Sequence, residues 1–186
     1  MEKDFGFTYK LTETGKAQGV FSLAEQRLPF ETINASNPIG DLLKAMVSLI
    51  QEPAHLWDEE NAAAVEWYSD EHLLVLEFSS PDGKTIDLSI TRNSAPFGEE
   101  SEPLSLSGTI ALEDFCLGII QELDKLIKNL GLLNYAQQWQ SDEFPLTWFL
   151  ILKKYLIGWK CWKPSPEEAD VLESEFMMIQ IGRAHV

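Results

Sequence analysis

Apolar and polar side chains alternate along several short stretches of the chain, with the period of two that is typical of half-buried β-strands. The first stretch covers residues 5–11, and after a turn around Gly15 a returning strand is predicted over residues 17–23. A third strand is predicted over residues 28–33. Because Pro29 cannot donate a hydrogen bond to a neighbouring strand, we expect this third strand at the edge of a sheet.

The apolar spacing then changes to three and four, which is the pattern of an amphipathic helix. Asn37-Pro38 is a favoured helix start, and the pattern ends at Gln51. Ser80-Pro81-Asp82-Gly83 is a turn sequence that predicts a hairpin between the strands on either side of it. Alternation returns after the helix and predicts four strands, over residues 65–68, 73–78, 86–90 and 104–110.

Helical spacing dominates the rest of the chain. A long helix is predicted from Leu112 to a glycine stop at Gly131. A short helix is predicted over residues 134–140, and an apolar, well-buried helix over residues 145–157. The order of strands, helix, strands and helices favours an α+β fold, with one antiparallel sheet of about five to six strands and two or three helices packed on one face.

A single domain is expected over residues 1–157, followed by a C-terminal extension over residues 158–179. Residues 180–186 read Gln-Ile-Gly-Arg-Ala-His-Val, and the last six resemble a translated sequencing adapter. We therefore expect residues 180–186 to be an artefact, and we give His185 no role as a ligand.

The chain has 30 acidic and 14 basic residues, for a formal net charge of −16 at pH 7. A charge of this sign argues against binding to DNA or RNA, whose phosphates attract Lys and Arg, and against binding to an anionic membrane. It attracts a basic protein partner, with faster association at low salt. The alternative is that the charge only keeps the protein soluble.

The two cysteines, Cys116 and Cys161, match no disulfide framework or metal motif. Cys116 lies among apolar residues of the long helix and is interpreted as a core residue. The first residues lack the features of a signal peptide, and the longest apolar stretch, over residues 146–152, is too short to span a bilayer. We expect a cytoplasmic protein with no membrane span, and the sequence leaves its oligomeric state open.

No catalytic, cofactor-binding or metal site is predicted. His55 and His72 lie beside no pattern of nucleophile and base, and the chain has no glycine-rich phosphate loop. Two groups of acidic residues stand out in loops, and they are interpreted either as solvated turns or as a partner surface. These residues are Asp58, Glu59, Glu60, Glu99, Glu100 and Glu102.

Residues 153–163 combine four lysines with Tyr155, Trp159 and Trp162. The two tryptophans are candidates for a partner-docking surface, because Trp and Tyr are frequent hot-spot residues in interfaces. A second interpretation is an interfacial helix that meets a membrane through Lys and Trp. The third is a buried helix whose lysines reach water while the tryptophans cover the core.

The pattern of elements and a set of motifs resemble a family of small bacterial α+β proteins that has no established activity. The resemblance covers roughly residues 5–157 and implies the fold alone. Its motif residues here are Gly40-Asp41-Leu42-Leu43, Phe115, Tyr135, Trp139 and Phe144-Pro145.

Two hypotheses about function remain. The first is a non-enzymatic interaction protein, such as an immunity protein that neutralises a basic toxin by binding it. The second is an enzyme or small-molecule binder with a pocket between the sheet and its helices, lined by aromatic residues such as Trp67, Trp139 and Trp148. The net charge and the missing catalytic pattern favour the first hypothesis.

Overall fold

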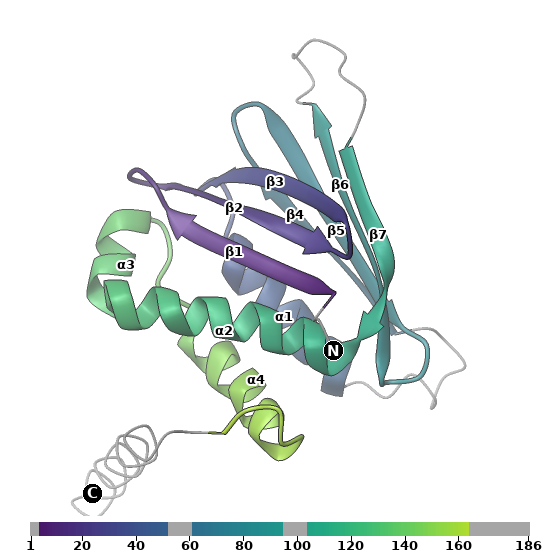
Figure 1. The fold of residues 1–186 in the computed structure, drawn as a ribbon. Helices are drawn as coiled ribbons and strands as arrows, with labels where there is room; N and C mark the ends of the chain where they lie inside the picture. The colour runs from purple at the N-terminus through teal and green to yellow at the C-terminus, as the bar shows by residue number, and fades with distance from the viewer. Residues whose placement is uncertain (1–3, 52–60, 95–103, 164–186) are drawn as a thin grey trace, which may run out of the picture.

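Seven strands and four helices make up the described part of the chain, which is residues 4–51, 61–94 and 104–163 of the computed structural model (Figure 1). The strands are β1 (Phe5–Leu11), β2 (Lys16–Leu23), β3 (Gln26–Ile33), β4 (Asn61–Tyr68), β5 (His72–Ser80), β6 (Thr85–Ser94) and β7 (Leu104–Ala111). The helices are α1 (Pro38–Gln51), α2 (Leu112–Leu130), α3 (Leu132–Trp139) and α4 (Leu146–Gly158).

The strands form two antiparallel sheets. One sheet has the order β1-β2-β3 and the other the order β4-β5-β6-β7. Figure 1 shows the three-stranded sheet lying across the four-stranded one, with α1 separating them in the chain. The α+β class and the antiparallel pairing are confirmed, whereas the expected single sheet of five to six strands is corrected to two sheets, and the expected two or three helices to four in the described ranges. The division has a physical reason, because two twisted sheets can bury their apolar faces against each other.

Aromatic side chains fill the space between the two sheets. The ring centroid of Trp67, on β4, lies 5.8 Å from that of Phe21 and 5.3 Å from that of Phe30, which belong to β2 and β3. Trp67 and Trp139 are fully buried. The small-molecule hypothesis placed these two tryptophans around a pocket. In the structure they fill the core.

The helices cover the remaining sides of the core. α1 packs beside β4, α2 packs along β1, and α4 contacts both α1 and α2 (Figure 1). Gly131 ends α2 as expected, because its φ of 86° suits glycine and its N–H bonds to the carbonyl of Ile127. The helix expected over residues 145–157 is less buried than its composition indicates, since Leu150 keeps 37% of its surface exposed. Among the described helices, none has the length and apolar content needed to cross a membrane.

Side chains cover the edges of the three-stranded sheet. At the β1 edge, the backbone N–H of Tyr9 donates to Oε1 of Glu122 on α2, at 3.2 Å. At the β3 edge, Nη1 of Arg92 on β6 donates to the carbonyl of Pro29, at 2.7 Å. Pro29 thus lies in an edge strand, as the sequence predicted.

Both edges of the four-stranded sheet also carry side-chain hydrogen bonds, at different places along the strand. On β7, Ser107 donates its N–H to Oε1 of Gln26 at 3.1 Å and accepts from Nε2 of the same amide at 2.9 Å. On β4, the carbonyl of Tyr68 accepts from Oγ1 of Thr32 at 3.1 Å. This bond holds only the last residue of β4.

Candidate functional site

The predicted acidic partner surface cannot be placed within the fold. All six of its acidic residues fall outside the described part of the chain, namely Asp58, Glu59, Glu60, Glu99, Glu100 and Glu102. His55 also lies outside it. Their role as a partner surface therefore stays a prediction.

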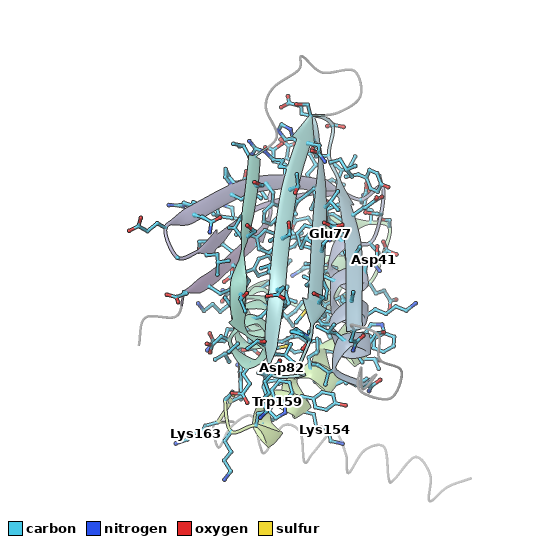
Figure 2. The ribbon with its side chains drawn as sticks, turned by 90° about the vertical axis from the view of Figure 1, so that its right-hand side faces the viewer. Asp41, Glu77, Asp82, Lys154, Trp159 and Lys163 are labelled. Atoms are coloured by element: carbon cyan, nitrogen blue, oxygen red, sulfur yellow. The ribbon has the colours of Figure 1, made fainter. Side chains whose placement is uncertain are left out.

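The two tryptophans of the predicted surface, Trp159 and Trp162, are half-buried and follow the end of α4. Figure 2 shows Trp159 there. The ring of Trp159 packs on that of Tyr155, with 5.7 Å between centroids. Nζ of Lys153 lies 4.5 Å from the ring centroid of Trp162, which is the geometry of a cation–π contact. Both tryptophans pack against the core with one side, so only their other side is available to a partner.

Lys153 differs from the expectation that the lysines of this segment reach water. Its Nζ donates to Oδ1 of Asp124 at 2.8 Å, and its side chain is only 12% exposed. Asp124 also pairs with Lys128, which is largely in solvent, at 2.8 Å. Lys153 therefore joins α4 to α2, whereas Lys154 and Lys163 are exposed as expected (Figure 2).

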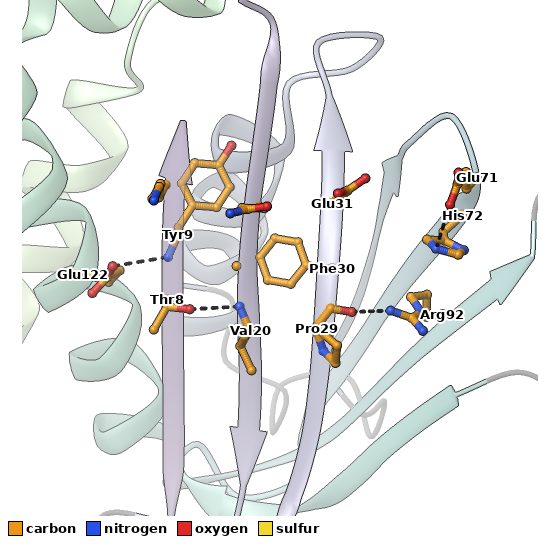
Figure 3. A pocket seen from close by; sticks show the side chains of 13 residues that line it. Thr8, Tyr9, Val20, Pro29, Phe30, Glu31, Glu71, His72, Arg92 and Glu122 are labelled. Carbon is orange, nitrogen blue, oxygen red and sulfur yellow. Dashed lines mark hydrogen bonds and ion pairs between the residues drawn. The ribbon is translucent and has the colours of Figure 1, made fainter. Parts of the chain in front are cut away.

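An open hollow of about 570 Å³ lies on the outer side of the three-stranded sheet (Figure 3). Its floor is formed by β1, β2 and β3, and Gly19 lies in the middle of it. A Cβ atom at Gly19 would lie 1.8 Å from the carbonyl oxygen of Thr8 and 2.7 Å from the ring of Phe30, so no larger residue fits there. The close approach of these strands requires the glycine.

The charged side chains around this hollow are mixed in sign. Arg92 and Glu122 are hydrogen-bonded to the edges of the sheet, and Nε2 of His72 lies 3.9 Å from Glu71 (Figure 3). Among the described residues that line the hollow, no nucleophile is hydrogen-bonded to a base. Elsewhere, burial raises the pKa of Cys116 to about 12, so its thiol is a core group, as expected.

No group of His, Cys, Asp and Glu residues that could hold a metal ion occurs in the described ranges.

The outer face of the four-stranded sheet is acidic (Figure 2). Within the described strands, the charged side chains that point to this side are Glu66, Glu77 and Asp87, and no Lys or Arg accompanies them. Strand register makes Glu66 and Glu77 diagonal neighbours on this face, and likewise Glu77 and Asp87. Diagonal neighbours lie about 7–8 Å apart. We call this surface the acidic face.

A groove runs beside the acidic face, between α1 and β4, and has a volume of about 640 Å³. Asp41, Lys44, Ala45 and Ser48 form its helical wall, and residues 63–66 of β4 form the other wall. We call it the α1–β4 groove. A smaller cleft of about 420 Å³ shares Asp41 and Lys44 with it and continues to the start of α4.

Electrostatics favour a cation near Asp41, where the α1–β4 groove meets the smaller cleft. The pKa of Asp41 is raised from its ordinary value, first by burial and then by repulsion from the nearby carboxylate of Asp142, while Lys44 acts in the opposite direction. A positive charge placed between these carboxylates would relieve the repulsion. Oε2 of Glu66 accepts a hydrogen bond from the hydroxyl of Tyr68 at 2.6 Å, which holds that carboxylate in place beside the groove.

Sequence reasoning missed this groove for a local reason. The predicted strand began at Val65, but β4 begins at Asn61 and includes Ala62, Ala63 and Ala64. Alanine has little preference for strands, so three in a row gave no signal. The alternation of exposed and less exposed positions continues through the alanines. In the sequence this alternation is clear only from Val65 onward, where an apolar, a charged and an aromatic residue follow one another.

Comparison with known proteins adds no relative: no protein-family model, curated protein or solved structure matches the chain. The resemblance to a family of small bacterial α+β proteins stays a prediction.

Proposed function

We propose that this protein is a non-enzymatic binding protein that docks a basic protein partner on its acidic face. One observation carries the proposal: the charged side chains that point outward from the described strands of the four-stranded sheet are all carboxylates. A surface of one charge sign attracts a partner of opposite sign and accelerates the encounter between them.

The spacing of the carboxylates supports a combined effect. The screening length at physiological ionic strength is about 8 Å, close to the separation of diagonal neighbours in a sheet. The potentials of Glu66, Glu77 and Asp87 therefore add over the face. All three side chains are exposed, so no desolvation opposes their charge in the free protein.

An enzyme or small-molecule binder has weaker support. The side chains of Arg92 and Glu122 at the hollow are already bonded to backbone groups of β3 and β1. Of the three tryptophans expected around a pocket, only Trp148 lines a cleft, the one beside the start of α4. The hollow and this cleft are open on one side and offer no arrangement of nucleophile and base.

A charge-matched pair of triple variants tests the proposal. The first variant combines Glu66→Gln, Glu77→Gln and Asp87→Asn on the acidic face. The second combines Glu25→Gln, Glu31→Gln and Glu71→Gln, which are exposed carboxylates elsewhere. Affinity for a capped Lys-Thr-Lys-Val-Lys-Thr-Lys peptide is measured by fluorescence anisotropy at low salt.

We expect the acidic-face variant to bind the peptide about tenfold more weakly, since each rim charge contributes up to about 1 kcal/mol at low salt. The second variant should remain within about twofold of the unmodified protein by the same reasoning. Equal losses in both variants would mean that only the net charge matters, and the proposal would then be rejected.

A further inference from the structure

Polar side chains bond to all four edge strands, but on β4 the bond lies at the last residue, whereas on β1, β3 and β7 it lies inside the strand. Glu122 bonds to β1, Arg92 to β3 and Gln26 to β7. Closing edges in this way prevents unwanted pairing with other chains. On β4 only the carbonyl of Tyr68 is held, and within the described part of the chain no group bonds to the outer side of residues 62–66.

The bond at Tyr68 shows which backbone groups of β4 face outward. Its carbonyl accepts from Thr32 of β3, so it points away from β5. In an antiparallel pair, every second residue directs its N–H and C=O to the same side. The N–H and C=O groups of Ala62, Ala64 and Glu66 therefore also point away from β5, toward the open edge.

The open edge faces the α1–β4 groove, where we expect the added strand to lie. A paired strand lies about 4.8 Å from its neighbour, and the groove volume of about 640 Å³ is within the range of peptide-sized and ligand-sized sites. The walls carry small side chains at this level, Ala63 and Ala64 on β4 and Ala45 and Ser48 on α1. A backbone can thus approach β4 without displacing a large side chain.

We propose that β4 binds an extended basic segment of a partner protein as an additional strand of the four-stranded sheet. This inference rests on the proposed function and specifies its mode, in which backbone hydrogen bonds from Ala62, Ala64 and Glu66 hold the segment and carboxylates select it. Addition of a strand to an open edge, with a helix as the opposite wall, is an established mode of peptide recognition.

Charge selects a basic segment over a second copy of this chain. A strand in the groove lies between Glu66 on one side and Asp41 on the other, with Lys44 as the one basic residue of the groove wall. Two copies paired through β4 would bring these carboxylates together, and each copy carries a formal charge of −16. Like charges placed opposite each other oppose such pairing.

The alternation of side chains in a strand defines the expected ligand. Every second residue would lie on the acidic face beside Glu66 and Glu77, where Lys or Arg is favoured. The residues between them would point toward α1, where Ala45 and Ser48 leave room for small or branched side chains. The Lys-Thr-Lys-Val-Lys-Thr-Lys peptide has this pattern.

The test removes backbone bonding while keeping every charge. Ala64→Pro deletes an outward N–H without breaking a bond to β5, and proline is tolerated at such edge positions. Ala64→Thr is the matched control, because it adds similar bulk and keeps the N–H. A second probe is the same peptide N-methylated at its internal amides, which keeps its charge and loses its donors.

We expect Ala64→Pro and N-methylation of the peptide each to weaken binding about tenfold, because each removes backbone hydrogen bonds at the edge. The affinity of Ala64→Thr should stay within about twofold of that of the unmodified protein. Amide exchange at Ala62, Ala64 and Glu66 should slow when the unmodified peptide is added. If Ala64→Pro does not fold, the N-methylated peptide and the amide exchange decide the question on the unmodified protein.

The remaining outcomes separate the two proposals. One outcome is that the peptide binds Ala64→Pro normally, that the N-methylated peptide binds normally, and that only the acidic-face variant loses affinity. This outcome would reject strand addition and leave the acidic face as the docking surface. No binding of the peptide to the unmodified protein would reject both. A dimer in sedimentation that becomes a monomer in Ala64→Pro would identify a second copy as the occupant and overturn the inference.

Discussion

At the scale of single residues, two aspartates have pKa values shifted in opposite directions by their surroundings. The pKa of Asp41 is raised by burial and by Asp142. The pKa of Asp82 is lowered, chiefly by hydrogen bonds from the backbone N–H groups of Thr85 and Lys84, at 2.7 and 2.9 Å. Asp82 closes the β5–β6 turn, whereas Asp41 lies in a groove where its charge opposes folding.

These shifts predict opposite effects on the free energy of unfolding. A raised pKa means that the folded state disfavours the charged form of Asp41, so Asp41→Asn should raise the melting temperature at neutral pH. The gain should shrink as the pH falls through the raised pKa toward 3.8, the ordinary value, where both states become protonated. Thermal unfolding across this pH range measures it.

Asp82→Ala is the reference of opposite sign. Because the pKa of Asp82 is lowered in the folded state, its charge stabilises the fold at pH values above 3.8, the ordinary pKa. This stability is lost as the pH falls through the lowered pKa of the folded state. The variant should therefore melt earlier than the unmodified protein at neutral pH, with a smaller difference in acid. If Asp41→Asn also melted earlier at neutral pH, the charge of Asp41 would be stabilising and our account of the groove would be wrong.

At the scale of elements, most strands and helices could be predicted because their signals are local. Alternation revealed β1 and β7, and Pro29 correctly indicated an edge strand. The division into two sheets could not be predicted, because a strand's pattern tells which face is buried but not which strand pairs with it. The bond between Gln26 and Ser107 joins residues 81 positions apart, so sequence spacing carries no trace of it.

The candidate site shows the same limit. The net charge indicated a basic partner, but the carboxylates of the acidic face lie on separate strands, and only the register of β4, β5 and β6 brings them together. Sequence reasoning chose acidic loops instead, because consecutive carboxylates such as Glu99 and Glu100 are conspicuous in the chain.

Opening a second sheet edge should cause self-association. Gln26→Ala removes both hydrogen bonds to Ser107 on β7 and should lower the free energy of unfolding by about 1 kcal/mol in urea titrations. The exposed edge should also produce dimers or larger species in sedimentation velocity.

Gln18→Ala is the matched control for this variant, since Gln18 is an exposed glutamine of the same sheet. We expect it to match the unmodified protein in both sedimentation and stability. Equal behaviour of the two variants would show that Gln26 does not protect the edge of β7.

At the scale of the whole molecule, the formal charge of −16 is spread over a chain of 186 residues. Repulsion among like charges destabilises a compact state at low ionic strength. Local ion pairs such as Lys16–Glu13 offset only part of this repulsion, because exposed pairs contribute little.

Added salt should therefore stabilise the protein and weaken its binding to a basic partner. Raising the NaCl concentration from about 0.01 M to about 0.1 M shortens the screening length from about 30 Å to about 10 Å. We expect the melting temperature measured by calorimetry to rise over this range. A neutral solute at equal osmolality should leave the melting temperature unchanged. A melting temperature that fell with salt would indicate that attractive ion pairs dominate the balance of charge.

The strand order has a consequence for the path by which the chain folds. In both sheets the order of strands in space follows their order in the chain, so each strand pairs with its neighbour in sequence. Contacts of this kind form early, because short loops close at low entropic cost. The hydrogen bonds from Tyr9 to Glu122 and from Asn34 to Trp139 span 113 and 105 residues and bring together distant parts of the chain. We therefore expect the two meanders to form separately and early, and α2 and α3 to pack on the first of them late.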